Sequence, residues 1–203
     1  MVWRKWRRHL IDMSEKAIDY FISYPKSGRT WIRFMYLRYL ELHFGLIEKN
    51  VFDTEEKLIY YWQPEWVHLG MAPSEKNFFY AIGNVNFQLL QNCSCVWMTR
   101  SIYDTLVSLY HHTCHRSNIQ YEGDISGFIR DPLYGALKIC TFYAAMYNFA
   151  KKTILLKISY EDMQKDRKQV LLKILKYVGL NPKQDYIDIA VKESEFKYMQ
   201  ELG

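Results

Sequence analysis

The octet Tyr-Pro-Lys-Ser-Gly-Arg-Thr-Trp at residues 24–31 gathers the groups that an anion-binding loop needs. Gly28 lets the backbone come close to a ligand. Two hydroxyl donors and two positive charges accompany it, on Ser27, Thr30, Lys26 and Arg29. Because such groups bind phosphate and sulfate, the octet predicts an anion site.

The segments on either side predict the geometry that presents such a loop. Residues 17–23 form an apolar run typical of a buried strand, and apolar residues recur at helical spacing from Trp31 to His43, before Gly45. A strand, a short loop and a helix start expose unpaired N–H groups to an anion. The octet differs from the Walker pattern G-x-x-x-x-G-K-[ST], because it has one glycine and its lysine precedes that glycine. An ordinary strand–turn–helix is the alternative.

A second pair of candidate anion ligands lies near residue 100. Arg100 follows a predicted strand at 95–99, at the carboxyl end where ligands bind in open α/β sheets. Ser108 lies two turns into a predicted helix at 103–112. An arginine can grip a phosphate with two parallel hydrogen bonds, and a serine can add one more donor. The alternatives are a surface ion pair for Arg100 and a solvated serine at 108.

The remaining patterns predict an α/β fold. Further strands are expected at 66–71 and 153–159, and further helices from 133 or 134 to 150 and from 168 to 178. A short helix starting at Asp53 or Thr54 is also expected, and residues 78–90 are ambiguous. Strands that alternate with helices favour a three-layer α/β/α arrangement with a central, mainly parallel sheet, similar to the P-loop NTPases. Since no linker divides the chain, we predict a single domain over residues 1–203.

Composition and charge limit the classes of function. Hydrophobic residues make up 49% of the chain, which argues against disorder, and the net charge of +5 suits an anionic ligand. We expect no nucleic-acid partner. The four cysteines lack the spacing of a zinc site, so free thiols are expected. We see no transmembrane run and no signal peptide, which predicts a cytoplasmic protein.

The basic, tryptophan-containing start of the chain has two interpretations. Trp3, Trp6, Leu10 and Met13 share one face of a predicted helix. This helix could lie on a membrane surface, but we favour its packing against the domain.

The two anion motifs, in this order, resemble the sulfotransferases that use 3′-phosphoadenosine 5′-phosphosulfate (PAPS). The octet resembles their 5′-phosphosulfate loop, with Arg29 where the common form has threonine, and residues 96–111 resemble their 3′-phosphate segment. The strand that ends in Tyr160-Glu161-Asp162 and the segment from Ser194 to Met199 extend the similarity. The resemblance implies cofactor contacts from Lys26, Ser27, Gly28, Arg29, Thr30, Trp31, Arg100, Ser108, Tyr160, Ser194, Phe196 and Met199.

One family segment has no counterpart here. The family carries a later Arg-Lys-Gly segment that also grips the 3′-phosphate, whereas this sequence stops at Gly203. Either the chain is truncated, or another basic group substitutes, or cofactor binding is impaired.

Catalysis by this resemblance needs a cation and a base but no metal. Lys26 is the expected cation, and His68, on the predicted strand between the two motifs, is the expected base. Glu65 is the alternative base, and a packed strand histidine is the alternative role for His68. His111 and His115 are one helical turn apart, but no third metal ligand is evident.

The resemblance therefore implies in-line transfer of a sulfuryl group from PAPS to a hydroxyl or amine, leaving 3′-phosphoadenosine 5′-phosphate (PAP). The expected acceptor is a small molecule or a carbohydrate. The alternatives are a catalytically impaired nucleotide-binding or interaction protein and a P-loop nucleotide kinase. The sequence leaves the oligomeric state open.

Overall fold

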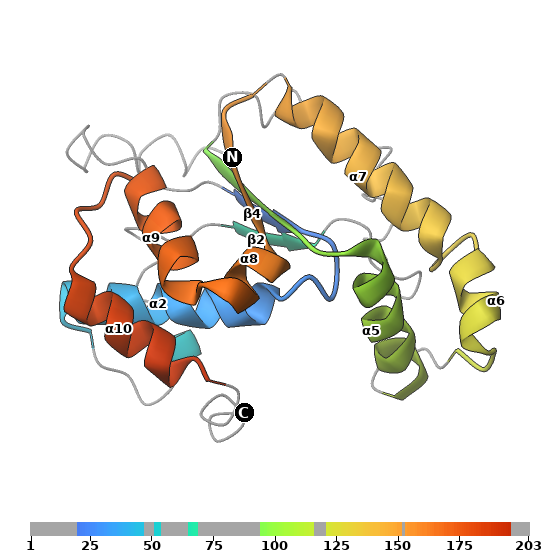
Figure 1. Ribbon diagram of the computed structural model, residues 1–203, viewed down its shortest axis with the longest axis horizontal. Coiled ribbons are helices and arrows are strands. Elements are labelled where there is room, and N and C mark those ends of the chain that lie inside the picture. The colour runs from blue at the N-terminus through green and yellow to red at the C-terminus, as the bar shows by residue number, and fades with distance from the viewer. Residues whose placement is uncertain are drawn as a thin grey trace. The chain divides into compact units, whose positions relative to one another are not determined.

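The computed structural model describes residues 20–46, 51–53, 65–68, 94–115, 121–151 and 153–195 (Figure 1). In these ranges the strands are β1 (Tyr20–Ser23), β2 (Glu65–His68), β3 (Cys95–Thr99) and β4 (Leu155–Ser159). The helices are α2 (Arg29–Phe44), α5 (Ile102–His115), α6 (Ile125–Arg130), α7 (Ala136–Ala150), α8 (Tyr160–Lys165), α9 (Arg167–Tyr177) and α10 (Gln184–Glu193). A 3₁₀ turn, η1, covers Val51–Asp53.

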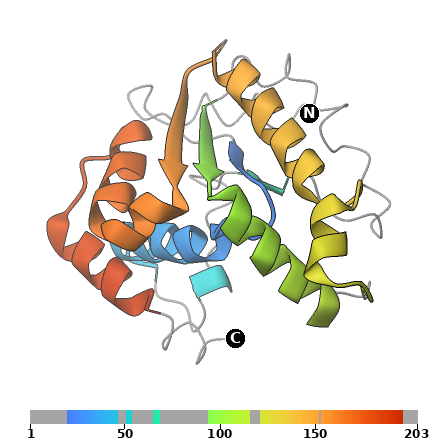
Figure 2. The ribbon, with the colours of Figure 1, turned by 45° about the vertical axis from the view of Figure 1, so that its right-hand side comes forward.

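The strands form one sheet in the order β2-β1-β3-β4. β3 pairs in parallel with both β1 and β4, with Ser23 opposite Met98 and Thr99 opposite Ser159. Figure 2 shows the arrows of β3 and β4 side by side and pointing the same way. The carboxyl ends of β1, β3 and β4 therefore share one edge of the sheet, and the chain leaves that edge at residues 24, 100 and 160.

The chain divides into two compact units. One contains residues 20–27 and 66–161, and so holds β1, β3, β4, α5, α6 and α7. The other contains residues 28–65 and 162–203, with α2, α9 and α10 among its described parts.

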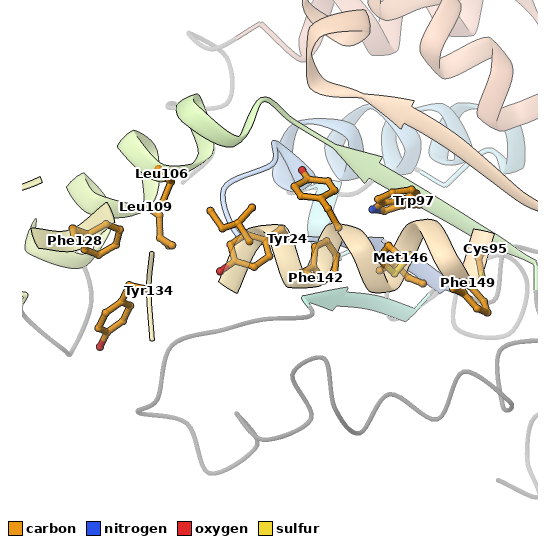
Figure 3. Close-up of a cluster of buried hydrophobic side chains, with 13 residues drawn as sticks. Tyr24, Cys95, Trp97, Leu106, Leu109, Phe128, Tyr134, Phe142, Met146 and Phe149 are labelled. Carbon is orange, nitrogen blue, oxygen red and sulfur yellow. The ribbon is translucent and has the colours of Figure 1, made fainter. Parts of the chain in front are cut away.

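The core of the first unit lies between the sheet and α7 (Figure 3). Residues two apart on a strand face the same side, which brings Ile22 and Tyr24 together with Cys95 and Trp97. A helical stripe from α7 packs against them, formed by Ile139, Phe142, Met146 and Phe149. Burial of each large side chain contributes about 1.5–3 kcal/mol, which fixes β1 and β3 and hence the start of the loop after β1.

The second unit is built around α2, which contacts both α9 and α10. Arg38 of α2 forms ion pairs with the fully buried carboxylate of Glu41, at 2.8 Å, and with Glu193 of α10, at 2.6 Å. Gly45 ends α2 in the left-handed conformation, with φ 68°, and its N–H donates to the carbonyl of Glu41. The predicted stop at Gly45 is therefore confirmed.

The structure confirms the predicted strand at 95–99 with the same bounds, and its β1, β2 and β4 confirm strands in the described parts of 17–23, 66–71 and 153–159. The helix expected from 133 or 134 begins only at Ala136. Here the Asp131 carboxylate accepts hydrogen bonds from the N–H groups of Leu133 and Tyr134 and holds them in a turn. Asp53 is the last residue of η1, and the helix expected from Asp53 or Thr54 falls on residues outside those described. The N-terminal helix, residues 54–61 and residues 78–90 lie outside the described residues.

Candidate functional site

The loop after β1 adopts a restrained conformation. The N–H of Ser27 donates to the carbonyl of Tyr24 over 3.3 Å, which closes a tight turn. Lys26 has φ 67° and Gly28 has φ 90°, both in the left-handed region. Glycine adopts this conformation freely, whereas a residue with a Cβ, such as Lys26, is destabilised there by about 1–3 kcal/mol. Surrounding contacts must therefore hold Lys26 in place.

The loop leads into an open helix start. Gly28 is the N-cap of α2, no side chain caps the helix, and its first turn holds no acidic residue. The first N–H groups and the positive end of the helix dipole thus suit an anion. The Ser27 hydroxyl is fully buried and has no hydrogen-bond partner, which an incoming anion oxygen would supply.

Arg100 reaches this loop from the end of β3. Its Nη1 donates to the backbone carbonyl of Lys26 over 2.7 Å. Its guanidinium also lies over the ring of Tyr160, with Cζ 4.3 Å from the ring centroid. Its Nε is buried without a hydrogen-bond partner and is a second donor that a bound anion could satisfy. The structure thus brings together three predicted site residues: Lys26, Arg100 and Tyr160.

Tyr143 of α7 fixes the backbone at this point. Its hydroxyl accepts from the N–H of Arg100 over 3.0 Å and donates to the Arg100 carbonyl over 2.9 Å. Burial raises the pKa of Tyr143, so the hydroxyl stays protonated and can donate. The hydrogen bond to the Arg100 backbone opposes this rise in pKa, and the nearby Ser27 hydroxyl opposes it to a smaller extent. Sequence reasoning missed Tyr143, because a tyrosine in an apolar helix gives no signal of such a role.

The segment that follows β3 is anchored at its start. The N–H of Ser101 donates to the carboxylate of Glu161 over 2.7 Å, which ties this segment to the end of β4. Ser108 lies in α5 and is half-buried. One turn before it, Thr105 is fully buried and its hydroxyl has no hydrogen-bond partner. Thr105 was not predicted as a site residue.

The second unit holds the remaining described candidates. The indole N–H of Trp31 donates to the carbonyl of Ser194 over 2.7 Å. The Arg167 guanidinium lies over the Trp31 ring, 5.1 Å from its centroid. The Ser194 hydroxyl is buried and donates to the carbonyl of Val191 over 2.7 Å, so it is engaged within the end of α10. Phe196 and Met199 lie outside the described residues.

The other loop side chains differ in exposure: Thr30 is exposed, and Lys26 and Arg29 are half-buried. His68 is the last residue of β2 and Glu65 the first, but both side chains lie outside what the structure describes. His111 and His115 stack with ring centroids 6.3 Å apart. Among the described residues, no group of three side chains could hold a metal ion.

Two further predictions concern the cysteines and the membrane. Cys95, Cys114 and Cys140 are free thiols, as expected, and Cys93 lies outside the described residues. In the described ranges, no helix combines the length and the apolar character needed to cross a membrane.

Comparison with known proteins identifies the family. The model of the sulfotransferase domain family matches residues 19–203, so the chain belongs to this family. Sulfotransferase 1E1 of Mus musculus is 24% identical over 192 residues, which cover 88% of this chain and 64% of that protein. The amine sulfotransferase of Oryctolagus cuniculus is 24% identical over 216 residues, covering 96% and 70%. The chain thus spans about 64% of the mouse relative's length.

Solved structures agree on the fold. Mouse sulfotransferase SULT7A1, complexed with PAP, superposes with a TM-score of 0.64 at 20% identity, covering 91% of this chain and 66% of that one. Retinol dehydratase in a complex with retinol and PAP gives a TM-score of 0.62 at 16% identity, covering 100% and 72%. The predicted α/β class, a three-layer α/β/α arrangement with a mainly parallel sheet, is confirmed.

Proposed function

We propose that this protein is a PAPS-dependent sulfotransferase that moves a sulfuryl group from PAPS to an acceptor hydroxyl or amine. The observation that carries the proposal is the contact between Arg100 and the loop at Lys26, at the carboxyl edge of the sheet. It joins two groups of anion ligands, one for each end of a nucleotide with phosphates at two positions. The family match and the PAP-bound relatives support the same reading.

Residues 1–203 would act as one sulfotransferase-like domain. The single family model that runs from residue 19 to residue 203, across both compact units, supports this. The sheet edge would then serve one nucleotide.

The residues of the loop fit the sulfated end of PAPS. The unpartnered Ser27 hydroxyl, the uncapped start of α2 and the charges of Lys26 and Arg29 would hold its 5′ end. Arg100 and Ser108 would hold the 3′-phosphate, Tyr160 would lie against the base, and Trp31 would also contact the cofactor. Ser194, Phe196 and Met199 complete the proposed set. When bound, PAPS supplies the sulfuryl group and the leaving phosphate.

The chain itself would supply a cation and a base. Lys26 would offset the negative charge that builds up on the oxygen between the leaving phosphate and the sulfuryl group. The neutral His68 imidazole would take the proton from the acceptor hydroxyl, which makes its oxygen a better nucleophile. Glu65 is the alternative base. Neither role calls for a metal.

The acceptor would be a small molecule or a carbohydrate. Names of the relatives support small molecules, because they include an amine sulfotransferase, a 3-beta-hydroxysteroid sulfotransferase and a retinol dehydratase crystallised with retinol. A steroid, a long-chain alcohol, an arylamine and a sugar form a suitable first panel.

Turnover with ³⁵S-labelled PAPS against this panel tests the proposal. We expect label to appear on at least one acceptor and to depend on that acceptor. Tight binding of PAP without any transfer would instead support a catalytically impaired nucleotide-binding protein. Phosphate transfer from ATP with Mg²⁺, without sulfuryl transfer, would support a nucleotide kinase.

A further inference from the structure

Tyr143 lies on α7, outside every segment that was assigned to the cofactor or to catalysis, yet its hydroxyl is hydrogen-bonded to Arg100, which contacts the loop. We propose that Tyr143 is a positioning residue, which acts through Arg100 to hold the loop at residues 24–28 in its anion-binding conformation. This inference rests on the proposed function, because it names a residue that holds the proposed anion-binding loop in place.

The first link joins α7 to the end of β3. The Tyr143 hydroxyl makes two hydrogen bonds to one residue, accepting from the Arg100 N–H at 3.0 Å and donating to the Arg100 carbonyl at 2.9 Å. Two bonds to the same residue fix both its position and its orientation. Arg100 is the first residue after β3. The pairing of β3 with β4 ends one residue earlier, at Thr99, so it does not restrain Arg100.

The second link joins Arg100 to the strained residue of the loop. Arg100 Nη1 donates its 2.7 Å hydrogen bond to the carbonyl of Lys26. Among the described residues other than glycine, Lys26 is the one with a positive φ. A left-handed residue with a Cβ persists only where its surroundings hold it. The bond from Arg100 acts on the peptide group of Lys26 itself, so it is well placed to supply this restraint.

The Tyr143 ring is held firmly enough to serve as the anchor. The residue is buried, and its ring lies 5.5 Å from Phe142 and 5.9 Å from Trp97, measured between centroids. Trp97 belongs to β3, three residues before Arg100. The anchor is thus part of the same core that fixes β1 and β3.

Hydrogen exchange of the protein without nucleotide tests the link directly. Tyr143→Phe removes the hydroxyl and keeps the ring. We expect faster amide exchange in peptides that cover residues 24–28 and 100–101, with residues 167–177 of α9 unchanged. Tyr147→Phe is the matched control, because Tyr147 lies one turn further along α7 and its hydroxyl accepts instead from Lys157 Nζ at 2.7 Å. This control should leave the loop unchanged.

Nucleotide affinity supplies a second readout. The loop would hold the 5′ end common to PAP and adenosine 5′-phosphate (AMP), so Tyr143→Phe should weaken both, each by about two- to tenfold. Tyr147→Phe should weaken neither. Should Tyr143→Phe fail to fold, Arg100→Lys breaks the same link from the other end, and faster exchange at residues 24–28 is again expected.

Unchanged exchange at residues 24–28 in Tyr143→Phe would overturn the proposal. So would a loss of PAP affinity with AMP affinity preserved, because it would place the effect at the 3′-phosphate alone. If the parent protein binds neither nucleotide, the proposed function fails, but the exchange experiment still decides whether Tyr143 holds the loop.

Discussion

The guanidinium of Arg100 donates a hydrogen bond from Nη1 to the backbone carbonyl of Lys26 over 2.7 Å. These residues lie 74 positions apart, and parallel pairing of β1 with β3 brings the ends of their strands to one edge. In the proposed function, Arg100 binds the 3′-phosphate and Lys26 lies beside the reacting sulfuryl group. Under that proposal, the bond joins the residue that recognises the 3′-phosphate to the backbone of the residue whose side chain acts in the reaction.

Arg100→Ala should weaken the binding of PAP more than the binding of AMP. Loss of a charged, two-pronged contact to the 3′-phosphate should cost roughly 1.5–3 kcal/mol for PAP. Loss of the hydrogen bond to the loop should weaken the binding free energy of both PAP and AMP by a smaller amount, about 0.5–1.5 kcal/mol. Calorimetric titration of both ligands measures the two losses. Equal losses for PAP and AMP would remove Arg100 from the 3′-phosphate site.

Lys26→Ala should lower turnover more than it lowers the affinity for PAP. A charge that acts mainly on the transition state changes the rate without an equal loss of ground-state binding. Arg29→Ala is the comparison, since Arg29 as a simple phosphate ligand would lower both quantities together. If product affinity falls as far as turnover in Lys26→Ala, the lysine serves only to bind the phosphate.

Much of the fold could be predicted from the sequence, because apolar periodicity reports burial. The run from Cys95 to Thr99 is buried throughout and was predicted with its observed bounds. The helices α6, α8 and α10 were missed. α6 has only six residues, too short for a periodic pattern, and it starts at an Asp124 cap whose carboxylate accepts from the Gly127 N–H over 2.7 Å.

The site was predicted only where a local motif marks it. The loop and Arg100 follow strands in recognisable order, so their placement at one sheet edge could be expected. Tyr143 could not be found in this way, because its hydrogen bonds to Arg100 are contacts between residues far apart in the sequence. The Arg100 side chain also contacts the loop carbonyl and Tyr160, which its motif alone did not indicate.

His68→Ala should lower turnover by about 10²–10⁴-fold and leave nucleotide affinity near the parent value. The reason is that a general base acts on the acceptor proton and not on the nucleotide. His68 ends β2, which lies beside β1 in the sheet. His111→Ala, on the exposed side of α5, is the control and should change turnover little. If His68→Ala keeps near-parent turnover, His68 is not the base, and Glu65 becomes the candidate.

Lys138→Met should stabilise the protein near neutral pH. Burial lowers the pKa of Lys138 to about 8 from 10.5, although the Asp131 carboxylate opposes the shift. Between these values the unfolded chain binds more protons than the folded one, so the parent's stability rises with pH as the lysine loses its charge. The advantage of the variant should therefore be largest below pH 8 and shrink toward pH 10.5.

Urea denaturation of the parent and Lys138→Met across this range measures the difference. Lys173→Met, at an exposed position of α9, controls for the loss of one positive charge. A stability difference for Lys138→Met that stays constant with pH would refute the predicted shift.

The proposed function requires this protein to recognise a nucleotide with phosphates at both the 5′ and 3′ positions. Isothermal titration of the parent protein with PAP, AMP and ATP plus Mg²⁺ measures this recognition. We predict that PAP binds roughly ten- to a hundredfold more tightly than AMP, from the added contact at Arg100. Equal affinities for PAP and AMP, or tighter binding of ATP with Mg²⁺, would contradict it.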